Sequence, residues 1–486
     1  MADHTTTARV LVASNRGPVS FGSADDGTLT VKRGGGGLVS GLSAIEDPHS
    51  VWVCAALGPA DREAVRRSPH GRLDRGGFDV GGHAVRMLDI DPADFDLAYN
   101  GVANSTLWFL HHLLYATPTA PAFDAAAAEQ WRAFERYNTA FAEALAAEAA
   151  EGAAVMVQDY HLTLVPALLR ELRPDLRIGY FLHIPWAPAD YFRMLPDELA
   201  VAVLTGVLGA DHAGFHTRRW AEAFADCCEQ VLGAEVDRSD RTRLTVEHQG
   251  RTTRLGVHAL GADADFLRER AHRADVEERL DHLRAAVGDR RTIVRVDRTE
   301  PSKNILRGLQ AYRHLLRSRP EWRERVVHIA FAYPSRQDLA EYRDYTAAVQ
   351  RISREITEEF ATDSWQPLIL QVEDDFARSL AAYRMADVAL VNPIRDGMNL
   401  VAKEVPVVSE AGCALVLSRE AGAYAELAED ALGINPFDVV GTAEALHRAL
   451  TMSPAERTER TKRLAAAATA LSPQQWFLAQ LAELSS

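Results

Sequence analysis

The sequence predicts an α/β protein with two doubly wound, Rossmann-like parallel-sheet domains, and three observations support this. Short apolar runs rich in β-branched residues alternate with long segments of helical periodicity, about a dozen times in all. The runs are apolar throughout, which is typical of parallel strands covered by helices on both faces. An open twisted sheet rarely exceeds about 10 strands, so this number indicates two sheets. The runs follow no fixed period, which excludes a solenoid.

The expected elements follow in chain order. In the first half, apolar runs predict strands at residues 8–15, 51–57, 153–158, 176–184, 209–215 and 252–260. In the second half, they predict strands at residues 291–296, 325–332, 367–372, 387–393, 412–418 and 431–437. Apolar residues at helical spacing predict long helices over Ala125–Ala150 and Arg336–Phe360.

A domain boundary is expected where the chain passes from a strand into the polar stretch Leu260–Asp275. This gives an N-terminal domain over residues 1–262 and a C-terminal domain over residues 263–470. Ser472 and Pro473 are good residues for a helix start, and they predict a last helix over residues 471–486 that crosses back to the first domain. Ligands are expected in an interdomain cleft, at the carboxyl ends of the strands.

Composition excludes several classes of protein. The chain has 53 basic and 68 acidic side chains, a net charge of −15 that argues against an extended nucleic-acid or membrane surface. No apolar run reaches the roughly 20 residues of a membrane helix, and no secretory leader is visible, so a cytoplasmic protein is expected. The cysteines are too few and scattered for a disulfide framework or a zinc site. The oligomeric state stays open, and a homo-oligomer is among the alternatives.

Polar residues at strand ends in the first half suit sugars and phosphates. The glycine run Gly34–Gly37, expected to open a helix at Leu38, suits an anion, although it could also be a hairpin tip. Asp159 and His183 each close a strand and could orient hydroxyls or share protons, the alternative being a buried structural histidine. Tyr99 and Trp108 could stack on a sugar ring, although such residues are more often core.

The second half contains a more specific constellation. Arg298 and Lys303 flank the start of a helix and make a local site for a diphosphate, unless they are simply a solvated face. Asp396 and Gly397 form a turn that opens a helix at residues 398–400, whose first amides suit a phosphate or sugar oxygen. Glu404, further along that helix, could accept hydrogen bonds from two ribose hydroxyls.

Together these motifs resemble the trehalose-6-phosphate synthase family, which is glycosyltransferase family 20. The segments SNR…GGL, DYHL, HIP, the Arg298–Lys303 pair and RDGMNLVAKE occur in the family's order, and the resemblance runs from Val10 to about Asn435. It implies a retaining glucosyltransferase of the GT-B fold.

The resemblance also implies a role for each matching residue. Donor binding falls to Gly36, Gly37, Arg298, Lys303, Asp396, Met398, Asn399, Leu400, Val401 and Glu404. Acceptor binding falls to Arg16, Tyr99, Trp108, Asp159 and Arg336. The residues closest to the reaction are His183, Arg298, Lys303, Asp396 and Asp159.

The implied reaction moves glucose from UDP- or GDP-glucose to glucose 6-phosphate, giving α,α-trehalose 6-phosphate. No cofactor and no metal are expected to be required, because two cations replace the metal at the leaving group. A pseudo-glycosyltransferase that couples cyclitols, a catalytically silent sugar-phosphate sensor and a nucleotide-sugar epimerase are the alternatives. Three features depart from the family: Asn304 follows Lys303 where Gly is usual, Pro406 should end or kink the helix of Glu404, and LQVEDDF is unusually acidic.

Overall fold

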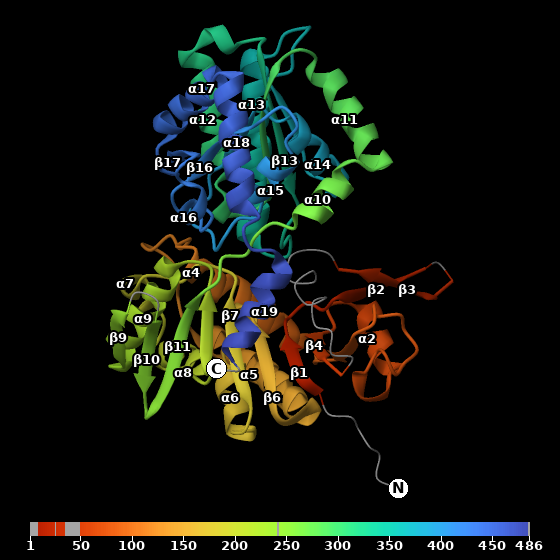
Figure 1. The fold of residues 1–486 in the computed structure, drawn as a ribbon, viewed down its shortest axis with the longest axis vertical. Helices are drawn as coiled ribbons and strands as arrows, with labels where there is room; N and C mark the ends of the chain where they lie inside the picture. Colours follow the sequence, from red (N-terminus) through yellow and green to blue (C-terminus); the bar gives the residue numbers. More distant parts are fainter. Residues whose placement is uncertain (1–7, 25, 35–48, 241–242, 485–486) are drawn as a thin grey trace. The chain divides into compact units, whose positions relative to one another are not determined.

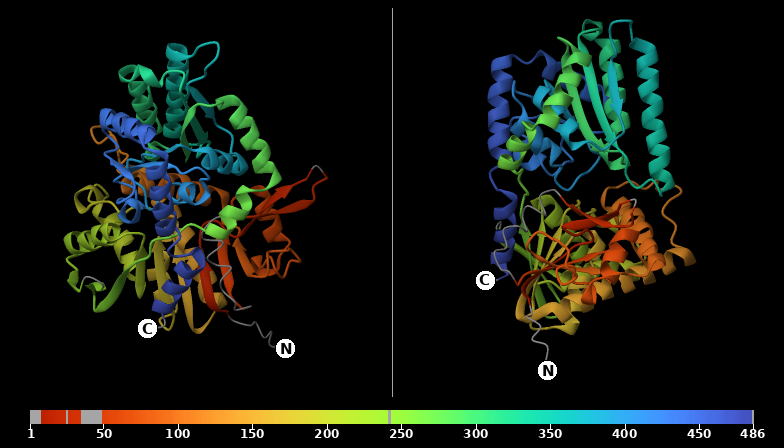
Figure 2. Two further views of the ribbon diagram at one scale, coloured as in Figure 1. Left: turned by 45° about the horizontal axis from the view of Figure 1, so that its top comes forward. Right: turned by 90° about the vertical axis from the view of Figure 1, so that its right-hand side faces the viewer.

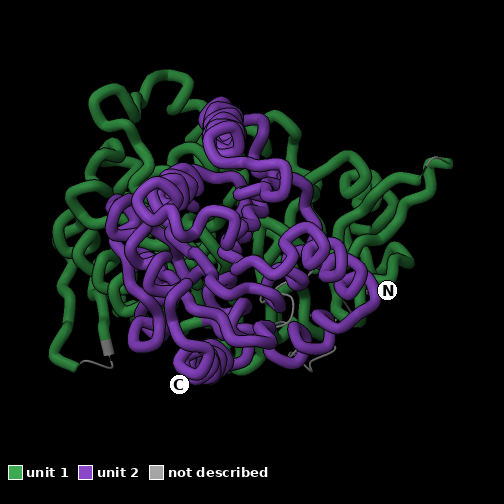
Figure 3. The backbone as a smooth tube through the Cα atoms, turned by 90° about the horizontal axis from the view of Figure 1, so that it is seen from above, with its two compact units in different colours: residues 1–259, 473–486 green, residues 260–472 purple. Residues whose placement is uncertain are grey.

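The computed structural model describes residues 8–24, 26–34, 49–240 and 243–484. The chain divides into two compact units (Figure 3). Unit 1 comprises residues 1–259 and 473–486, and unit 2 comprises residues 260–472. The division falls after Ala259, where the sequence predicts a boundary after residue 262, and the last helix groups with unit 1.

Unit 1 is built on one large sheet. Its described strands, in the order β5-β4-β1-β6-β7-β8-β11-β10-β9, form a nine-stranded sheet. Their bounds are β1 Ala8–Ala13, β4 Val51–Ala55, β5 Ala84–Leu88, β6 Ala149–Gln158, β7 Arg177–Leu182, β8 His212–Phe215, β9 Glu235–Asp240, β10 Arg243–His248 and β11 Arg251–Val257. Along the sheet, β5, β4, β1, β6, β7, β8 and β11 run parallel to one another, which places their carboxyl ends along one edge.

Helices of several lengths connect the strands of unit 1 (Figure 1). The α-helices are α2 Pro59–Arg66, α3 Pro92–Asp96, α4 Trp108–His111, α5 Ala125–Glu148, α6 Val165–Leu172, α7 Ala189–Phe192, α8 Asp197–Leu208, α9 Arg218–Leu232 and α19 Pro473–Glu483. In the described part of unit 1, the other helical segments are η1 Pro69–Gly71, the π-helix η2 Leu97–Leu107 and η3 Tyr160–Leu162. The predicted helix over Ala125–Ala150 is α5, and the side chain of Asp124 caps it by accepting from two backbone amides.

Unit 2 has a parallel sheet with the order β14-β13-β12-β15-β16-β17 in its described residues. The strands are β12 Arg291–Arg298, β13 Val326–Tyr333, β14 Leu368–Gln371, β15 Val388–Val391, β16 Ala414–Ser418 and β17 Leu432–Ile434. The helices are α10 Ala264–Ala271, α11 Ala274–Val287, η4 Pro301–Lys303, α12 Ile305–Ser318, η5 Pro320–Trp322, α13 Ala340–Phe360, α14 Phe376–Met385, α15 Val401–Val408, α16 Tyr424–Leu427, α17 Val439–Thr451 and α18 Pro454–Ala468. The right-hand view of Figure 2 shows this sheet edge-on, with helices on both faces.

The predicted α/β class with parallel sheets is confirmed, and each predicted strand overlaps an observed one. The wholly parallel arrangement is wrong for the edge of unit 1, where β9, β10 and β11 form an antiparallel meander. Their turn at Gln249 and Gly250 has positive φ at both residues, as a tight hairpin requires. A second hairpin, β2 Val19–Ser23 with β3 Leu29–Arg33, precedes the glycine run.

Two smaller differences concern helix starts and exposure. The predicted helix from Arg336 begins only at Ala340, because Arg336 adopts φ 44° in the preceding turn. The sequence predicts structural, partly exposed side chains for the adjacent His111 and His112. Both are instead fully buried: His112 stacks on Trp108, and the ring of His111 accepts from the amide of Ala187. None of the helices in the described residues combines the length and the hydropathy that crossing a membrane requires.

Candidate functional site

A cavity of about 240 Å³ opens in unit 2 where β12 and β13 end. Its lining comes from β12, η4, β13, α14 and the start of α15: Val296, Asp297, Arg298, Lys303, Tyr333, Phe376, Ser379, Tyr383, Asn399, Leu400, Val401 and Glu404. Six of the residues assigned to donor binding by resemblance are among them. The cavity therefore lies at the carboxyl ends of parallel strands, where ligands bind in such sheets.

Lys303, Asp396 and Asn399 form the most tightly connected group beside this cavity. The Nζ of Lys303 lies 2.5 Å from the Oδ2 of Asp396, and the Nδ2 of Asn399 donates to the same oxygen at 3.1 Å. Burial alone would lower the pKa of Lys303, but the negative charges of Asp396, Glu300 and Asp297 raise it above its usual value. The lysine is therefore a fixed positive charge, held against the Asp396 turn.

Local backbone geometry explains how these side chains meet. Asn304 follows the short helix η4 in the left-handed region, with φ 57°, and its Nδ2 donates to the carbonyl oxygens of Asn392 and Pro436 at 3.0 and 2.7 Å. This conformation favours glycine but is tolerated by asparagine, which explains why Asn can stand where the family usually has Gly. At the other turn, Gly422 is required because an added Cβ would lie 1.8 Å from the carbonyl oxygen of Gly397.

Arg298 and Glu300 form a second charged pair at the end of β12. The Nε of Arg298 lies 3.2 Å from the Oε1 of Glu300, whose side chain is fully buried, while the arginine side chain is 54% exposed. Burial would raise the pKa of Glu300, but the charges of Arg298, Arg336 and Lys303 outweigh it and lower that pKa to about 2. Glu300 thus remains ionised and organises the surrounding cations, with Ser335 donating to it at 2.8 Å.

Arg336 lies in the turn after β13 and takes part in the same charge cluster. Its Nη1 donates to the hydroxyl of Tyr342 at 2.6 Å, and its guanidinium lies 5.5 Å from the centre of that ring. Its positive charge contributes to the lowered pKa of Glu300. Arg298, Lys303 and Arg336 therefore supply positive charge to one region of unit 2, in a protein whose net charge is −15.

Glu404 lies in the first turn of α15 and lines the cavity. Burial raises its pKa to about 7, and a hydrogen bond with the hydroxyl of Tyr383 opposes that rise. Pro406 lies inside α15, which continues to Val408, so the expectation that the proline ends the helix is wrong. The helix is short and the proline follows Glu404, so the turn that carries the carboxylate is intact.

The start of α15 lies later than predicted. The helix begins at Val401 with Leu400 as its N-cap, because Asn399 has φ 72° and cannot continue a helix backwards. The Oδ1 of Asn399 accepts from the amide of Ala402 at 3.2 Å. Met398 is buried, and its carbonyl oxygen accepts from the amide of Ala423 at 2.8 Å. The segment is thus fixed by side-chain and backbone hydrogen bonds before the helix starts.

In unit 1, Asp159 and His183 follow the neighbouring strands β6 and β7. The amide of His183 donates to the Oδ1 of Asp159 at 3.2 Å, and its Nε2 lies 2.9 Å from the Oε1 of Gln158. Burial lowers the pKa of His183 to about 4, so its imidazole is neutral at physiological pH. Asp159 adopts φ 74° and ψ 168°, a region almost restricted to glycine, and such strain is concentrated at functional sites.

The aromatic residues of unit 1 differ in their surroundings. Tyr99, on the π-helix η2, stacks on His161 with ring centres 5.6 Å apart and is partly exposed. Trp108 is only 5% exposed and packs against His112 and Tyr160, an arrangement that also suits a core residue. π-helical segments are rare and frequent at functional sites. The assignment of Trp108 to the acceptor stays a prediction.

The remaining predicted residues fall at the N-terminal end of unit 1. Arg16 is exposed just after β1, whose neighbour in the sheet is β6. Gly36 and Gly37, and the helix expected from Leu38, lie outside the described residues. The structure therefore brings six of the predicted donor residues of unit 2 together around one cavity, with Asp396 in contact with Lys303 beside it, whereas Met398 is buried and does not line the cavity. It places Asp159, His183 and Arg16 at carboxyl strand ends of unit 1.

Several residues around the cavity of unit 2 were not found by sequence reasoning: Asp297, Glu300, Tyr333, Ser379 and Tyr383. Asp297 is buried and paired with Arg295, whose Nη2 lies 2.7 Å from its Oδ2 and also donates to the carbonyl oxygen of Lys303 at 3.1 Å. In the sequence, an acidic residue follows the apolar run of β12, and this position is a signal that could have identified Asp297. Tyr333 and Ser379 come from separate elements, and only the fold brings them together.

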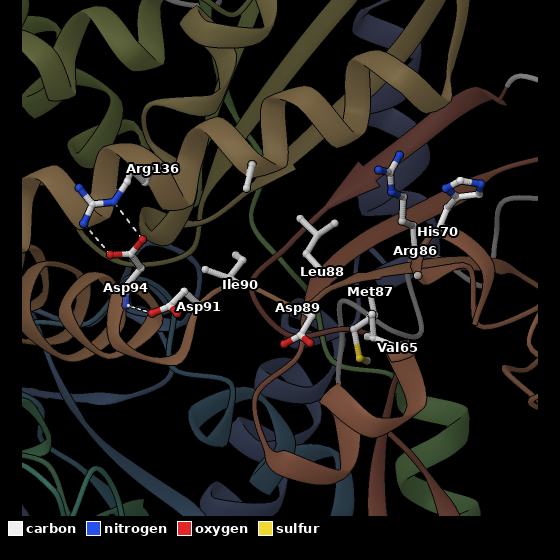
Figure 4. Close-up of a pocket in the computed structure, with 12 residues that line it drawn as sticks. Val65, His70, Arg86, Met87, Leu88, Asp89, Ile90, Asp91, Asp94 and Arg136 are labelled. Carbon is white, nitrogen blue, oxygen red and sulfur yellow. Dashed lines mark hydrogen bonds and ion pairs between the residues drawn. The ribbon is translucent and has the colours of Figure 1, made fainter. Parts of the chain in front are cut away.

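Unit 1 contains a second cavity, of about 480 Å³, shown in Figure 4. It lies between the end of β5, α3 and α5, and none of the predicted site residues lines it. Its most prominent charges are already paired: Arg136 from α5 contacts Asp94 at 2.5 Å, and Asp91 caps α3 through the amides of Ala93 and Asp94. We therefore assign the functional site to the residues described above and not to this cavity.

Comparison with known proteins gives a consistent result. The model of "Glycosyltransferase family 20" matches residues 8–486. The chain is 34% identical to the "Trehalose-6-phosphate synthase" of Mycobacterium sp. (strain JLS), over 98% of this chain and 96% of that protein. It is 35% identical to the "Bifunctional trehalose-6-phosphate synthase/phosphatase" of Thermoproteus tenax, where the match covers 93% of this chain but 60% of that protein.

Solved structures agree with these matches. The E. coli trehalose-6-phosphate protein described as "bound with UDP-2-fluoro glucose" superposes with a TM-score of 0.85, at 27% identity over 99% of both chains. The "alpha,alpha-trehalose-phosphate synthase (UDP-forming)" of Burkholderia xenovorans, in complex with glucose-6-phosphate, superposes with a TM-score of 0.84 at 28% identity, over 99% of this chain and 100% of that one. The GT-B fold class and the family resemblance found in the sequence are confirmed. The chain therefore belongs to glycosyltransferase family 20.

Proposed function

We propose that this glycosyltransferase moves glucose from a nucleoside diphosphate, either UDP or GDP, to glucose 6-phosphate, forming α,α-trehalose 6-phosphate with retention of configuration. The observation that carries the proposal is the Lys303–Asp396 contact beside a cavity that Arg298 also lines. The family's solved relatives with a UDP-glucose analogue and with glucose-6-phosphate support both substrate classes.

In this mechanism the bond between the glucose anomeric carbon and the diphosphate oxygen breaks, and a new bond forms to the anomeric oxygen of glucose 6-phosphate. The proton of that acceptor hydroxyl passes to a departing phosphate oxygen, so no protein nucleophile is needed. Arg298 and Lys303 stabilise the negative charge that grows on the diphosphate. Asp396, which Lys303 and Asn399 orient, accepts hydrogen bonds from donor glucose hydroxyls.

The other residues position the two substrates. Glu404 accepts hydrogen bonds from the ribose hydroxyls of the donor, and Asp159 orients the acceptor. Arg16 and Arg336 are each assigned to the phosphate of glucose 6-phosphate by the family resemblance, and a guanidinium group is well suited to pair with phosphate oxygens. Neutral His183 can donate to or accept from a donor glucose hydroxyl without adding charge. Positive charge at the leaving group comes from side chains, so we expect transfer to need no metal ion.

The test is a donor panel. Purified protein is given UDP-, GDP- or ADP-glucose with glucose 6-phosphate, and the disaccharide phosphate is measured. We expect turnover with at least one donor, and its loss in an Asp396→Asn variant. Replacing Arg354, exposed on α13, by Ala is the matched control and should leave turnover unchanged. Absence of product with every donor would contradict the proposal and favour cyclitol coupling or a silent sensor.

A further inference from the structure

Three metal-ligating side chains converge in unit 1, apart from the residues assigned to transfer. They are His212 at the start of β8, His258 just after β11, and Glu483 at the end of α19. The Oε2 of Glu483 contacts the Nε2 of His212 and lies 3.4 Å from the Nε2 of His258. One ligand atom from each residue lies within 4.8 Å of the others. Sequence patterns do not reveal this cluster, because its members are far apart in the chain.

The strand register explains why the two imidazoles face the same way. β8 and β11 are parallel neighbours, with His212 opposite Arg254 and Gly214 opposite Gly256. Side chains alternate along a strand, so position 256 shares a face with His212 and with His258. Both histidines are almost fully buried there, and their ring centres are 5.4 Å apart.

Gly256 leaves the space that the cluster occupies. A Cβ at this position would lie 2.3 Å from the Nε2 of His212 and 2.6 Å from the Nε2 of His258. Contacts this short do not occur, so any larger residue would push the two ring nitrogens apart. Both ring nitrogens can therefore lie this close to position 256 only because the strand carries glycine there.

The third ligand is fixed by the packing of α19. Trp476 of this helix is fully buried, and its Nε1 donates to the carbonyl oxygen of His258 at 2.9 Å. At the other end, Arg254 donates to the carbonyl oxygen of Glu483 at 2.5 Å. The helix lies beside strands of the unit 1 sheet in Figure 1. Its end thus stays over the two histidines, while the Glu483 side chain is 43% exposed, which gives an ion access from solvent.

We propose that His212, His258 and Glu483 form a zinc site that holds the C-terminal helix α19 against the sheet of unit 1. Two imidazole nitrogens and one carboxylate oxygen are a ligand set that zinc favours, and a water molecule completes four-coordination. Zinc bonds of roughly 2.0–2.2 Å bring ligand atoms within about 4 Å of one another. In this structure one ligand atom from each residue lies within 4.8 Å of the others, which is close to that arrangement.

The experiment measures zinc binding to the full, untagged chain after chelator treatment and desalting. Isothermal titration with zinc chloride should give one saturable site per chain. Glu483→Gln and Gly256→Ala should each weaken that site by at least about tenfold, because one removes a ligand and the other places a Cβ against both ring nitrogens. Glu410→Gln is the matched control: it also removes a carboxylate close to a histidine, 3.6 Å from His272 in unit 2, and should leave binding unchanged.

Thermal unfolding gives an independent readout, since an ion that binds only the folded chain raises Tm. Zinc should raise the Tm of the wild type and of Glu410→Gln, and not that of Glu483→Gln. If Gly256→Ala fails to fold, His258→Asn replaces it in both experiments. Absence of a saturable site, or equal zinc affinity in the wild type and in Glu483→Gln, would overturn the proposal and leave a metal-free hydrogen-bonded cluster.

Discussion

Replacing Glu404 by Gln tests whether the buried, ionised carboxylate of Glu404 in the cavity of unit 2 destabilises the folded chain. Burial raises the pKa of Glu404 from 4.5 to about 7. The folded chain therefore keeps this proton between pH 4.5 and 7, whereas the unfolded chain has already lost it. The contribution of Glu404 to the free energy of unfolding consequently falls as pH rises through this range and is level above it. A salt-bridged carboxylate would show the opposite dependence on pH.

The expected size follows from the same values. A difference of about 2.5 pH units corresponds to about 3 kcal/mol at most, because each unit is worth about 1.4 kcal/mol. Glutamine removes the buried charge, so at pH 8 the variant should be more stable than the wild type by up to this amount. At pH 5 the two should be closely matched. In exchange, the variant should bind the nucleotide-linked donor more weakly, since a ribose ligand is lost.

Urea unfolding followed by tryptophan fluorescence at pH 5, 6, 7 and 8 measures the difference. Glu358→Gln, on the exposed face of α13, is the control for loss of one carboxylate and should follow the wild type. The reasoning is refuted if Glu404→Gln and the wild type lose stability in parallel across this pH range, or if the variant is less stable at pH 8.

Three further predictions concern single residues. Lys303→Ala should lower kcat/KM by about 100-fold in steady-state kinetics, with Lys303→Arg in between, because Asp396 loses its cation; equal rates would contradict this. Asp159→Ala should be less stable than Asp159→Gly in thermal unfolding, by about 1 kcal/mol, because φ 74° suits glycine; the reverse order would count against backbone strain. With a pKa of about 4, His183 stays neutral from pH 5 to 8. The pH profile of kcat should therefore show no ionisation near pH 6.5 that belongs to His183, and any ionisation seen there should persist in His183→Asn.

Strand positions could be predicted well because buried parallel strands are apolar throughout, as in β12 and β13. The hairpins could not, because β9 is polar and mostly exposed and has no hydrophobic signature. The late start of α15 depends on the positive φ of Asn399, which an asparagine permits but does not require.

The residues of the candidate site also divide into those that the sequence predicts and those that only the fold reveals. Lys303 and Asp396 are found in sequence because each sits in a recognisable segment after a strand, and the structure brings them into contact. Glu300 was overlooked, since a single acidic residue between two cations resembles an ordinary surface charge until its burial is known. Tyr383 reaches Glu404 from another helix, and a single sequence contains no information on such pairing.

The central claim is that Arg298 and Lys303 stabilise the departing diphosphate. Its most direct test is kcat of Arg298→Ala at saturating donor and glucose 6-phosphate, with Arg354→Ala as control. Removing one donor of this kind costs about 10²–10³ in kcat, or roughly 3–4 kcal/mol, and we predict a loss of that size. Turnover within about threefold of the wild type would contradict the account, since the arginine could not then supply the electrostatic stabilisation of the leaving group that we assign to it.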